Sequence, residues 1–491
     1  MTKTIAVVNP ATEKVIGEVA DDGPEEVHKA VSRAKKAWDH WRQVPAHGKA
    51  ELLHEISRRI KTGADELATI LTREGGKPLR ENKDEMGWAA SCFDYYAEIA
   101  RNSRGRVIPS SETSQLNLVV KEPYGVVGAI VPWNYPILLM SWKLAPALAA
   151  GNVVVLKPAE QTPLATLVFR KIFDCLPKGA VEIVTGYGET TGEAVVRHPD
   201  TALIAFTGSL DTGKKILRLC VDGVKKVHLE LGGKDAFVVC EDSDLDIAVK
   251  AVAWASFLNA GQVCTSAERV YVQKDIYKPF LERLQAFTEG LVVGDGMQPD
   301  TDVGPMIGAP YREKVERHVK DALKRGAKLV AGGKKPDRPG WFFEPTVLAD
   351  VDHGMTVMRD ETFGPVCPVM PYKSFDEAIR LANDSIYGLG ANIYTHDSRK
   401  IKKFFEEVQA GTIWINDPLT DNDAGPFGGY KATGGSRELG EEGLAAFQQV
   451  KHVHWDFEQK AKPWWYPYGR KNKKTLGGAG GGRRVDALEQ R

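Results

Sequence analysis

One cysteine of the chain stands in a polar turn between two apolar runs, in the stretch Phe257-Leu-Asn-Ala-Gly-Gln-Val-Cys264-Thr-Ser-Ala-Glu-Arg269. A cysteine that serves only packing more often lies inside an apolar run. Thirty-four residues before Cys264, Glu230 interrupts the apolar segment 229–233, which ends in two glycines. A thiol and a carboxylate in an apolar setting are the groups that covalent catalysis at a carbonyl carbon requires.

Each of these two residues also has a simpler interpretation. Cys264 needs activation, because an unperturbed thiol with a pKa of about 8.5 is mostly protonated near neutral pH. The alternative is a buried, inert cysteine, which fits the other five better, at positions 92, 175, 220, 240 and 367. The apolar neighbours of Glu230 favour the raised pKa of a general base, and the alternative is a glutamate at a strand end that points to solvent. Gly232 and Gly233 favour function, because glycines let a ligand approach the backbone.

An asparagine between aromatic residues and prolines is the third candidate. Asn134 lies in the stretch 131–136, Val-Pro-Trp-Asn-Tyr-Pro. Held in this way, its amide group can donate a hydrogen bond to an oxyanion that develops during a reaction. The alternative, equally supported by the residue alone, is a turn asparagine that satisfies nearby backbone groups.

Two further motifs follow apolar runs and point to a dinucleotide cofactor. Lys157 ends the run 153–156, and Glu160 follows three residues later. Ligands of open α/β sheets bind at the carboxyl ends of strands, where Glu160 can accept hydrogen bonds from ribose hydroxyls and would repel a 2′-phosphate, which favours NAD over NADP. The alternative is a surface ion pair. The stretch 206–213, Phe-Thr-Gly-Ser-Leu-Asp-Thr-Gly, opens a helix whose N–H groups can bind pyrophosphate, although it lacks the GxGxxG pattern.

Alternating strands and helices must position these residues. Helical spacing predicts helices over 24–39, 47–73 and 83–101. An extended hairpin is expected over 104–122. The short apolar runs 126–131, 153–156, 181–184, 203–206 and 236–240 indicate a parallel sheet that is covered on both faces. A second α/β series follows Cys264, with strands 269–272 and 412–416 and helices 277–290, 311–326 and 375–383. The thiol is therefore expected near the junction of two α/β domains, where ligand sites are common.

Composition narrows the class of protein. The chain has 491 residues, which is too long for a single core and predicts two or three domains. Lys and Arg balance Asp and Glu at 65 each, so no net charge recruits nucleic acid or a membrane. The six cysteines are scattered without a zinc-like spacing, which predicts no metal site and favours reduced thiols in the cytoplasm. Neither a signal peptide nor a transmembrane helix is expected.

Taken in order along the chain, the motifs resemble those of the aldehyde dehydrogenase superfamily. The resemblance extends from about Asn9 to about Phe457. Its most specific pieces are Pro132-Trp-Asn-Tyr-Pro, Phe206-Thr-Gly-Ser, Leu229-Glu-Leu-Gly-Gly-Lys, Gly261-Gln-Val-Cys, Glu361-Thr-Phe-Gly-Pro and Pro426-Phe-Gly-Gly-Tyr-Lys.

The resemblance implies a role for each candidate. Cys264 matches the nucleophile, Glu230 the general base, and Asn134 the oxyanion donor, assisted by the backbone N–H of Cys264. Glu361 and Phe363 match residues that hold the nicotinamide ribose and ring. The implied cofactor is NAD, with NADP less favoured. The full set of residues expected to bind it is Val131, Pro132, Trp133, Lys157, Glu160, Gly208, Ser209, Thr212, Gly213, Leu231, Gly232, Glu361 and Phe363.

The resemblance also implies a tunnel for the aldehyde. Its expected lining is Tyr135, Leu139, Trp142, Leu258, Val263, Thr265, Asp421 and Phe427. This lining is mostly apolar and aromatic, which predicts an aliphatic or aromatic aldehyde. The acidic residues of the segment 417–423 would favour a cationic substrate such as an aminoaldehyde or betaine aldehyde. A solvated acidic loop is the interpretation that the sequence favours.

The expected reaction ends in a carboxylic acid. The thiolate attacks the aldehyde carbon, a hydride leaves to NAD, and water activated by Glu230 hydrolyses the thioester. A CoA-acylating enzyme is the first alternative, but it needs no water-activating glutamate, and Glu230 argues against it. A non-catalytic scaffold on the same fold is the second alternative, and the presence of both Cys264 and Glu230 argues against it.

The resemblance finally implies an α/β fold with a Rossmann-like cofactor domain, an α/β catalytic domain and a bridging β element that makes homodimers or homotetramers. The expected ranges are 1–103 and 123–232 for the cofactor domain, 233–435 for the catalytic domain and 104–122 with 436–458 for the bridge. The tail 459–491 is aromatic, then basic, and flexible at its end. Packing against a neighbouring subunit is favoured for this tail over peripheral membrane contact.

Overall fold

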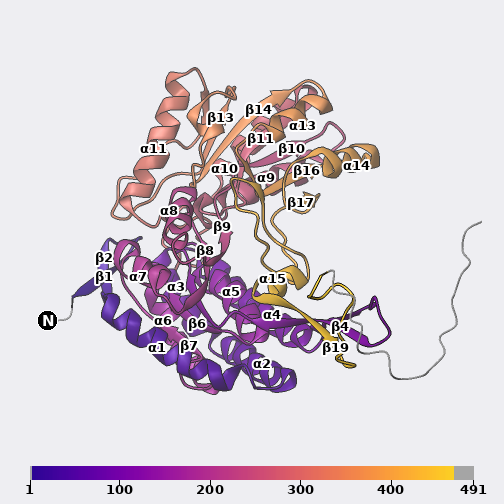
Figure 1. Ribbon diagram of the computed structural model, residues 1–491. Helices are drawn as coiled ribbons and strands as arrows, with labels where there is room; N and C mark the ends of the chain where they lie inside the picture. Colours follow the sequence, from indigo (N-terminus) through magenta and orange to yellow (C-terminus); the bar gives the residue numbers. More distant parts are fainter. Residues whose placement is uncertain (1–2, 469–491) are drawn as a thin grey trace, which may run out of the picture. The chain divides into compact units, whose positions relative to one another are not determined.

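The structure is a computed structural model that describes residues 3–468 (Figure 1). The end of the tail, for which the sequence predicts flexibility, lies outside the described residues. The chain forms two compact units. Of the described residues, 3–104 and 121–450 form the first unit, and 105–120 and 451–468 form the second.

The first unit contains a five-stranded sheet in which all neighbouring strands are parallel. Its strand order is β7-β6-β5-β8-β9, so the chain winds outward from β5 in one direction and then returns to its other side with β8. Ligands of such sheets bind at the carboxyl ends of the strands beside this reversal. The strands are β5 (Val126–Ile130), β6 (Val153–Lys157), β7 (Val181–Ile183), β8 (Thr201–Thr207) and β9 (Lys226–Glu230).

Helices pack against this sheet. Helices α1 and α5 each contact β5 and β6, whereas α7 contacts β8 and α8 contacts β9. The sequence predicted one helix over 47–73, but the chain forms two, because Gly63 leaves the helical conformation with a ψ of 6°. The helices are α1 (Pro24–Trp41), α2 (Ala46–Thr62), α3 (Ala64–Gly75), α4 (Leu79–Ala100), α5 (Pro136–Ala150), α6 (Pro163–Ile172), α7 (Glu193–Arg197) and α8 (Leu210–Cys220), with short turns η1 (Phe173–Cys175) and η2 (Gly188–Gly192).

A seven-stranded sheet forms the other half of the first unit, in the pink to orange part of Figure 1. Its order is β12-β13-β14-β11-β10-β16-β17, and only the β12–β13 pair is antiparallel. The strands are β10 (Asp235–Val239), β11 (Ala267–Gln273), β12 (Lys328–Ala331), β13 (Thr346–Ala349), β14 (Val366–Tyr372), β16 (Gly390–Tyr394) and β17 (Thr412–Ile415). The helices of this half are α9 (Leu245–Phe257), α10 (Tyr277–Glu289), α11 (Ala309–Lys324), α12 (Thr356–Arg359), α13 (Phe375–Asn383) and α14 (Ser398–Glu407), with turns η3 (Leu258–Gly261) and η4 (Lys274–Ile276).

Smaller elements complete the description. A three-stranded sheet with the order β19-β4-β3 includes the segment in which the sequence predicted a hairpin, and β3 and β4 pair antiparallel. Among the described residues, no helix is long and apolar enough to cross a membrane. The remaining elements are β1 (Thr4–Asn9), β2 (Lys14–Ala20), β3 (Arg106–Ile108), β4 (Gln115–Pro123), β15 (Tyr387–Gly388), β18 (Tyr430–Lys431), α15 (Gly440–Ala446) and β19 (Gln448–Asp456).

A buried arginine ties the seven-stranded sheet to a neighbouring helix. Arg269 lies on β11 and is only 3% exposed. Its guanidinium donates to the backbone carbonyls of Lys234, Leu381 and Ala382 at 2.7, 2.8 and 2.9 Å. These bonds join the start of β10 to the end of α13. A buried carbonyl that loses its donor keeps its desolvation cost, so Arg269 is needed once the segments are packed.

We predict that Arg269→Met lowers the free energy of unfolding by about 3 kcal/mol or more, because three buried carbonyls lose donors that are worth about 1–3 kcal/mol each. The matched control is Arg283→Met, which removes a surface pair with Asp246 and costs under about 1 kcal/mol. Thermal unfolding followed by circular dichroism measures both variants. Equal shifts of the melting temperature would show that the Arg269 bonds do not stabilise the sheet.

Candidate active site

Cys264 lies between the strained turn η3 and the first residue of β11. Asn259 and Gly261 in this turn have φ values of 48° and 68°, in the left-handed region. A Cβ atom on residue 261 would lie 2.1 Å from the carbonyl oxygen of Gly364. Only glycine fits there, both because of its φ and because of this close approach. The turn fixes the direction in which the chain presents the thiol.

Asn134, from the loop after β5, reaches the same turn. Its side chain is 7% exposed, and its Nδ2 donates to the carbonyl oxygen of Gln262 at 3.0 Å. The backbone carbonyl oxygen of Asn134 accepts hydrogen bonds from Asn259 Nδ2 and from Lys77 Nζ, both at 3.3 Å. Lys77 forms a buried ion pair with Glu85. The amide of Asn134 is therefore held in one place beside Cys264.

Two cavities share Cys264, Asn134 and Leu139 in their linings. The first has a volume of about 700 Å³ and the second of about 550 Å³. The first is lined by every residue that the sequence assigned to the substrate tunnel, namely Tyr135, Leu139, Trp142, Leu258, Val263, Thr265, Asp421 and Phe427. We call it the substrate cavity.

The second cavity, which we call the cofactor cavity, lies at the carboxyl ends of the five-stranded sheet. It is lined by Val131, Pro132, Trp133, Lys157, Glu160, Gly208, Ser209, Thr212, Leu231, Gly232, Glu361 and Phe363, all of them predicted from the sequence. Gly213 was also predicted but does not line it. A Cβ on residue 213 would lie 2.6 Å from the Leu231 side chain, so Gly213 instead allows close packing of α8.

Polar groups at this edge have the geometry expected for a nucleotide. Lys157 Nζ lies 3.1 Å from Glu160 Oε2, where β6 ends. Ser209 caps α8, since its Oγ accepts from the N–H of Thr212 at 3.3 Å. A carboxylate beside a lysine suits ribose hydroxyls, and the start of a helix suits a phosphate group.

A buried ion pair positions the opposite wall of the cofactor cavity. Glu361 accepts from the N–H of Gly233 at 3.0 Å, and burial, followed by the charge of Glu268, raises its pKa to about 7. Glu268 accepts from the two N–H groups of residues 362–363 at 2.7 Å and pairs with Lys234 Nζ at 2.5 Å. Glu268 thus holds the loop that carries Phe363. The sequence does not indicate this role, because a glutamate next to an arginine is typical of an ion pair on the protein surface.

Glu230 ends β9 and is 2% exposed. Within the described chain, neither of its carboxylate oxygens has a hydrogen-bond partner. Burial raises the pKa of Glu230 well above its ordinary value, and the charge of Glu438 adds to the effect. Glu438 itself is paired with buried Lys143. The structure brings Cys264 and Asn134 together, but Glu230 is not among the residues that line either cavity.

The comparison with known proteins decides the family. The chain matches the model described as "Aldehyde dehydrogenase family" over residues 1–453. The chain belongs to the aldehyde dehydrogenase family. The resemblance predicted from the motifs is confirmed, and with it the enzyme class, an oxidoreductase that acts on aldehydes.

Relatives within the aldehyde dehydrogenase family differ in the substrate that they are named for. The betaine aldehyde dehydrogenase of Bacillus subtilis is 39% identical, over 94% of this chain and 95% of that protein. A probable NADP(+) succinate-semialdehyde dehydrogenase of Sinorhizobium fredii is 40% identical, over 91% of this chain and 92% of that protein. Betaine aldehyde dehydrogenase from Staphylococcus aureus, solved in complex with NAD+, superposes with a TM-score of 0.92 at 36% identity and covers 95% of this chain and 94% of that one. The predicted α/β fold is therefore confirmed.

Several residues that line the cavities of this aldehyde dehydrogenase were not predicted from the sequence. In the cofactor cavity they include Tyr311 and Lys314 from α11. In the substrate cavity they are Trp88, Tyr95, Glu98 and Trp254, among others. Trp88 and Trp254 are 44% and 47% exposed. A large aromatic side chain on the polar face of a helix was the available signal for both.

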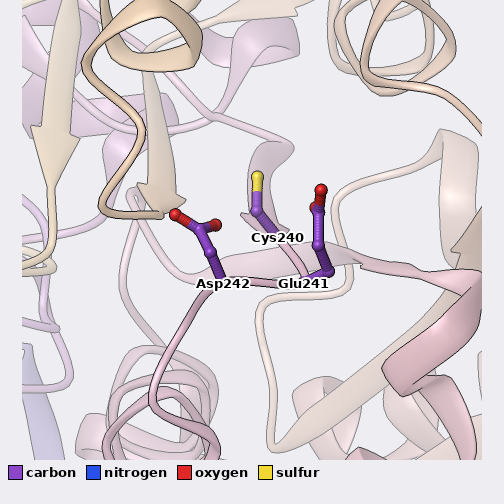
Figure 2. Close-up of side chains that lie close together, drawn as sticks. All are labelled: Cys240, Glu241 and Asp242. Atoms are coloured by element: carbon purple, nitrogen blue, oxygen red, sulfur yellow. The ribbon is translucent and has the colours of Figure 1, made fainter.

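One cluster outside the two cavities has side chains of metal-ligating type. Figure 2 shows Cys240, Glu241 and Asp242 close together where β10 ends. Glu241 is paired with Lys400 at 2.6 Å. Asp242 accepts from the Thr395 hydroxyl at 2.8 Å and from two backbone N–H groups that follow it. The carboxylates already serve the protein's own donors, so this cluster does not point to an ion.

The surroundings of Cys264 disfavour the thiolate form of its side chain. Its side chain can be reached through the cavities, but protein atoms surround it. Burial raises the pKa of the Cys264 thiol well above its ordinary value, and the charges of Asp235, Glu361 and Asp421 add to the effect. The thiolate is the form that reacts. Its population rises with pH until the pH passes the raised pKa, because the thiol ionises over that range.

We predict that inactivation of the free enzyme by iodoacetamide accelerates about tenfold for each pH unit from pH 7 to pH 9, because the thiolate fraction grows in that proportion below the pKa. Loss of activity against time measures the rate, and free glutathione is the control, since its rate levels off once an unshifted thiol is ionised. A plateau for the enzyme below pH 8 would mean that Cys264 is not shifted upward.

Proposed function

We propose that the chain oxidises an aldehyde to the carboxylic acid, with NAD as hydride acceptor and Cys264 as nucleophile. The observation that carries the proposal is that Cys264 and Asn134 line both the substrate cavity and the cofactor cavity. A group at this position can reach the aldehyde from one side and a nicotinamide from the other. Solved relatives in complex with NAD+ support this choice of cofactor.

The residues of the cofactor cavity fit NAD. Glu160 and Lys157 are placed for ribose hydroxyls, the start of α8 for the pyrophosphate, and Glu361 and Phe363 for the nicotinamide half. Bound NAD supplies the acceptor for the hydride that leaves the aldehyde carbon. Relatives named for NADP exist, but the carboxylate of Glu160 disfavours a 2′-phosphate by charge repulsion.

Cys264 gives its thiol proton to solvent, and the thiolate begins the reaction by attacking the carbonyl carbon. The aldehyde oxygen becomes an oxyanion, and the Asn134 amide and the backbone N–H of Cys264 donate hydrogen bonds to it. An amide NH₂ group has two hydrogens. One hydrogen of the Asn134 amide is donated to the Gln262 carbonyl, with an N–O distance of 3.0 Å. The second hydrogen is free to bind the substrate oxygen. After the hydride has left, the acyl group remains on Cys264 as a thioester.

Glu230 completes the cycle as the base that activates water. Its raised pKa makes the carboxylate a stronger base than an ordinary glutamate, as general-base catalysis requires. The carboxylate lines neither cavity, so it must turn toward Cys264 for this step. Water then adds to the thioester carbon, the carbon–sulphur bond breaks, and the acid leaves.

The structure also supports proposals for domains and assembly. The two sheets of the first unit separate between Glu230 and Asp235, which supports a domain boundary near 232. The sheet of β3, β4 and β19 carries exposed apolar side chains, including Val107 and Trp455, which supports a subunit interface. We propose a cytoplasmic homodimer or homotetramer with a cofactor domain (1–103, 123–232), a catalytic domain (233–435) and a bridge (104–122, 436–458).

We predict that Cys264→Ala abolishes turnover, whereas Glu230→Gln keeps one rapid burst of NADH per active site and loses steady-state turnover by about 100-fold, since general-base catalysis contributes about that much. Stopped-flow absorbance at 340 nm measures the burst. Cys175→Ala, a cysteine that lines neither cavity, is the control and keeps full activity. Normal turnover by Glu230→Gln, or acyl-CoA as the product, would contradict the hydrolytic role of Glu230.

We predict that Glu160→Gln raises kcat/KM for NADP relative to NAD by about fivefold or more, because one repulsive charge beside the 2′-phosphate is worth about 1 kcal/mol at a solvated site. Initial rates with each cofactor at a fixed aldehyde concentration give the ratio. Asp174→Asn removes an exposed carboxylate that lines neither cavity and leaves the ratio unchanged. The same change in both variants would mean that Glu160 does not face the adenosine ribose.

A further inference from the structure

The substrate cavity is unbalanced in charge. Four of its lining residues are acidic, namely Asp94, Glu98, Asp421 and Asp423. Among the described residues that line it, there is no lysine, arginine or histidine. Asp94 is compensated from outside the cavity, since its carboxylate lies 2.7 Å from Lys61 Nζ. The other three acids decide what the cavity can accept.

These three acids have no cationic partner in residues 3–468. Asp423 accepts a short hydrogen bond from the hydroxyl of Ser91, which is neutral. Asp421 and Glu98 make no side-chain hydrogen bond or ion pair within the described chain. Three carboxylates around one cavity repel each other, and a bound cation would remove that repulsion.

Asp421 is the most affected of the three. Its side chain is exposed to solvent where it lines the substrate cavity, and neighbouring protein atoms lie around it. Burial, followed by the charge of Asp423, raises the pKa of Asp421 to about 7. The charge of Asp421 also contributes to the raised pKa of Cys264. The carboxylate is therefore close enough to the nucleophile for a substrate bound to Cys264 to reach it.

The aromatic lining divides the cavity into two regions. Tyr135, Trp142 and Phe427 are buried, at 6%, 4% and 6% exposed, and Trp142 and Phe427 lie 4.8 Å apart between ring centroids. Trp88 and Trp254 are nearly half exposed and line the same cavity near solvent. The buried aromatics suit an apolar chain. Exposed tryptophans beside carboxylates are the surroundings that an ammonium group prefers, because the ring faces attract cations.

We infer that the physiological substrate class is an aldehyde that carries an ammonium or alkylated ammonium group on a short apolar spacer. The carbonyl lies at Cys264, the spacer among the buried aromatics, and the cation between Asp421, Asp423 and the outer tryptophans. This inference rests on the proposed aldehyde oxidation. It replaces the sequence-based preference for a neutral apolar aldehyde, in which the acidic segment 417–423 was taken as solvated.

The experiment uses three aldehydes of similar size and different charge. They are 4-(trimethylammonio)butanal, its neutral isostere 5,5-dimethylhexanal, and the anionic 4-oxobutanoate. We expect the kcat/KM of the full-length enzyme with NAD to be about tenfold or more higher for the cation than for the neutral isostere, and lowest for the anion. Because the first two aldehydes match in shape, their ratio reports the charge alone.

Variants locate the origin of the preference. Asp421→Asn should lower the ratio of kcat/KM for the cation to that for the neutral isostere by about tenfold, mainly through KM, because one close carboxylate is lost. Asp417→Asn is the matched control in the same segment; Asp417 is exposed and does not line the cavity, so the ratio stays the same. Added salt should lower the ratio for the unmodified enzyme, since it screens solvent-accessible charges.

The two proposals fail in different ways. Absence of NADH formation with all three aldehydes would overturn the proposed oxidation itself. Oxidation of the neutral or anionic aldehyde at an equal or higher kcat/KM would overturn the inferred substrate charge and leave the oxidation standing. The same change of the ratio in Asp417→Asn and Asp421→Asn would show that the charge of the segment acts at long range and that the cation does not bind beside Asp421.

Discussion

The hydrogen bond from the Asn134 amide to the carbonyl of Gln262 joins the two halves of the first unit at the reacting centre. Asn134 belongs to the loop after β5 of the five-stranded sheet, and Gln262 to the turn before β11 of the seven-stranded sheet. The donor and the nucleophile therefore come from separate α/β layers. Their spacing can stay fixed only if both loops are held, and the surrounding contacts serve that requirement.

Buried ion pairs hold these loops. Lys77 pairs with Glu85 and donates to the Asn134 carbonyl, and Lys234 pairs with Glu268, which binds the backbone of the loop at 362–363. A buried ion pair adds little stability compared with apolar packing, because desolvation offsets the attraction. Breaking one is costly, however, so each pair specifies one arrangement of the loop that it holds. Glu230 lacks such a partner in the described chain, and burial, followed by the charge of Glu438, raises its pKa well above the ordinary value.

The sequence predicted the parts of the site that follow strands. Lys157 and Glu160 could be placed because an apolar run ended at them, and the structure puts both in the cofactor cavity. The break at Gly63 was missed because the apolar spacing continues through it, and only the backbone there departs from the helix. Glu268 was missed because its role depends on N–H groups about 95 residues further along the chain, which no local pattern contains.

The substrate cavity shows why the chemistry was easier to predict than the specificity. The reacting groups lie in short motifs at strand ends, where the local sequence determines position. The charge of the cavity comes instead from α4, which carries Glu98, and from the loop after β17, which carries Asp421. Each element alone has a polar face like that of a solvent-exposed segment. The sequence of such a face predicts that an acidic side chain on it points into solvent. Only when the two elements face one cavity without a cation does their shared charge become a constraint on the substrate. Because the side chains of Glu98 and Asp421 take no part in the Asn134–Gln262 contact, this charge can differ between relatives while the oxidation of the aldehyde stays the same.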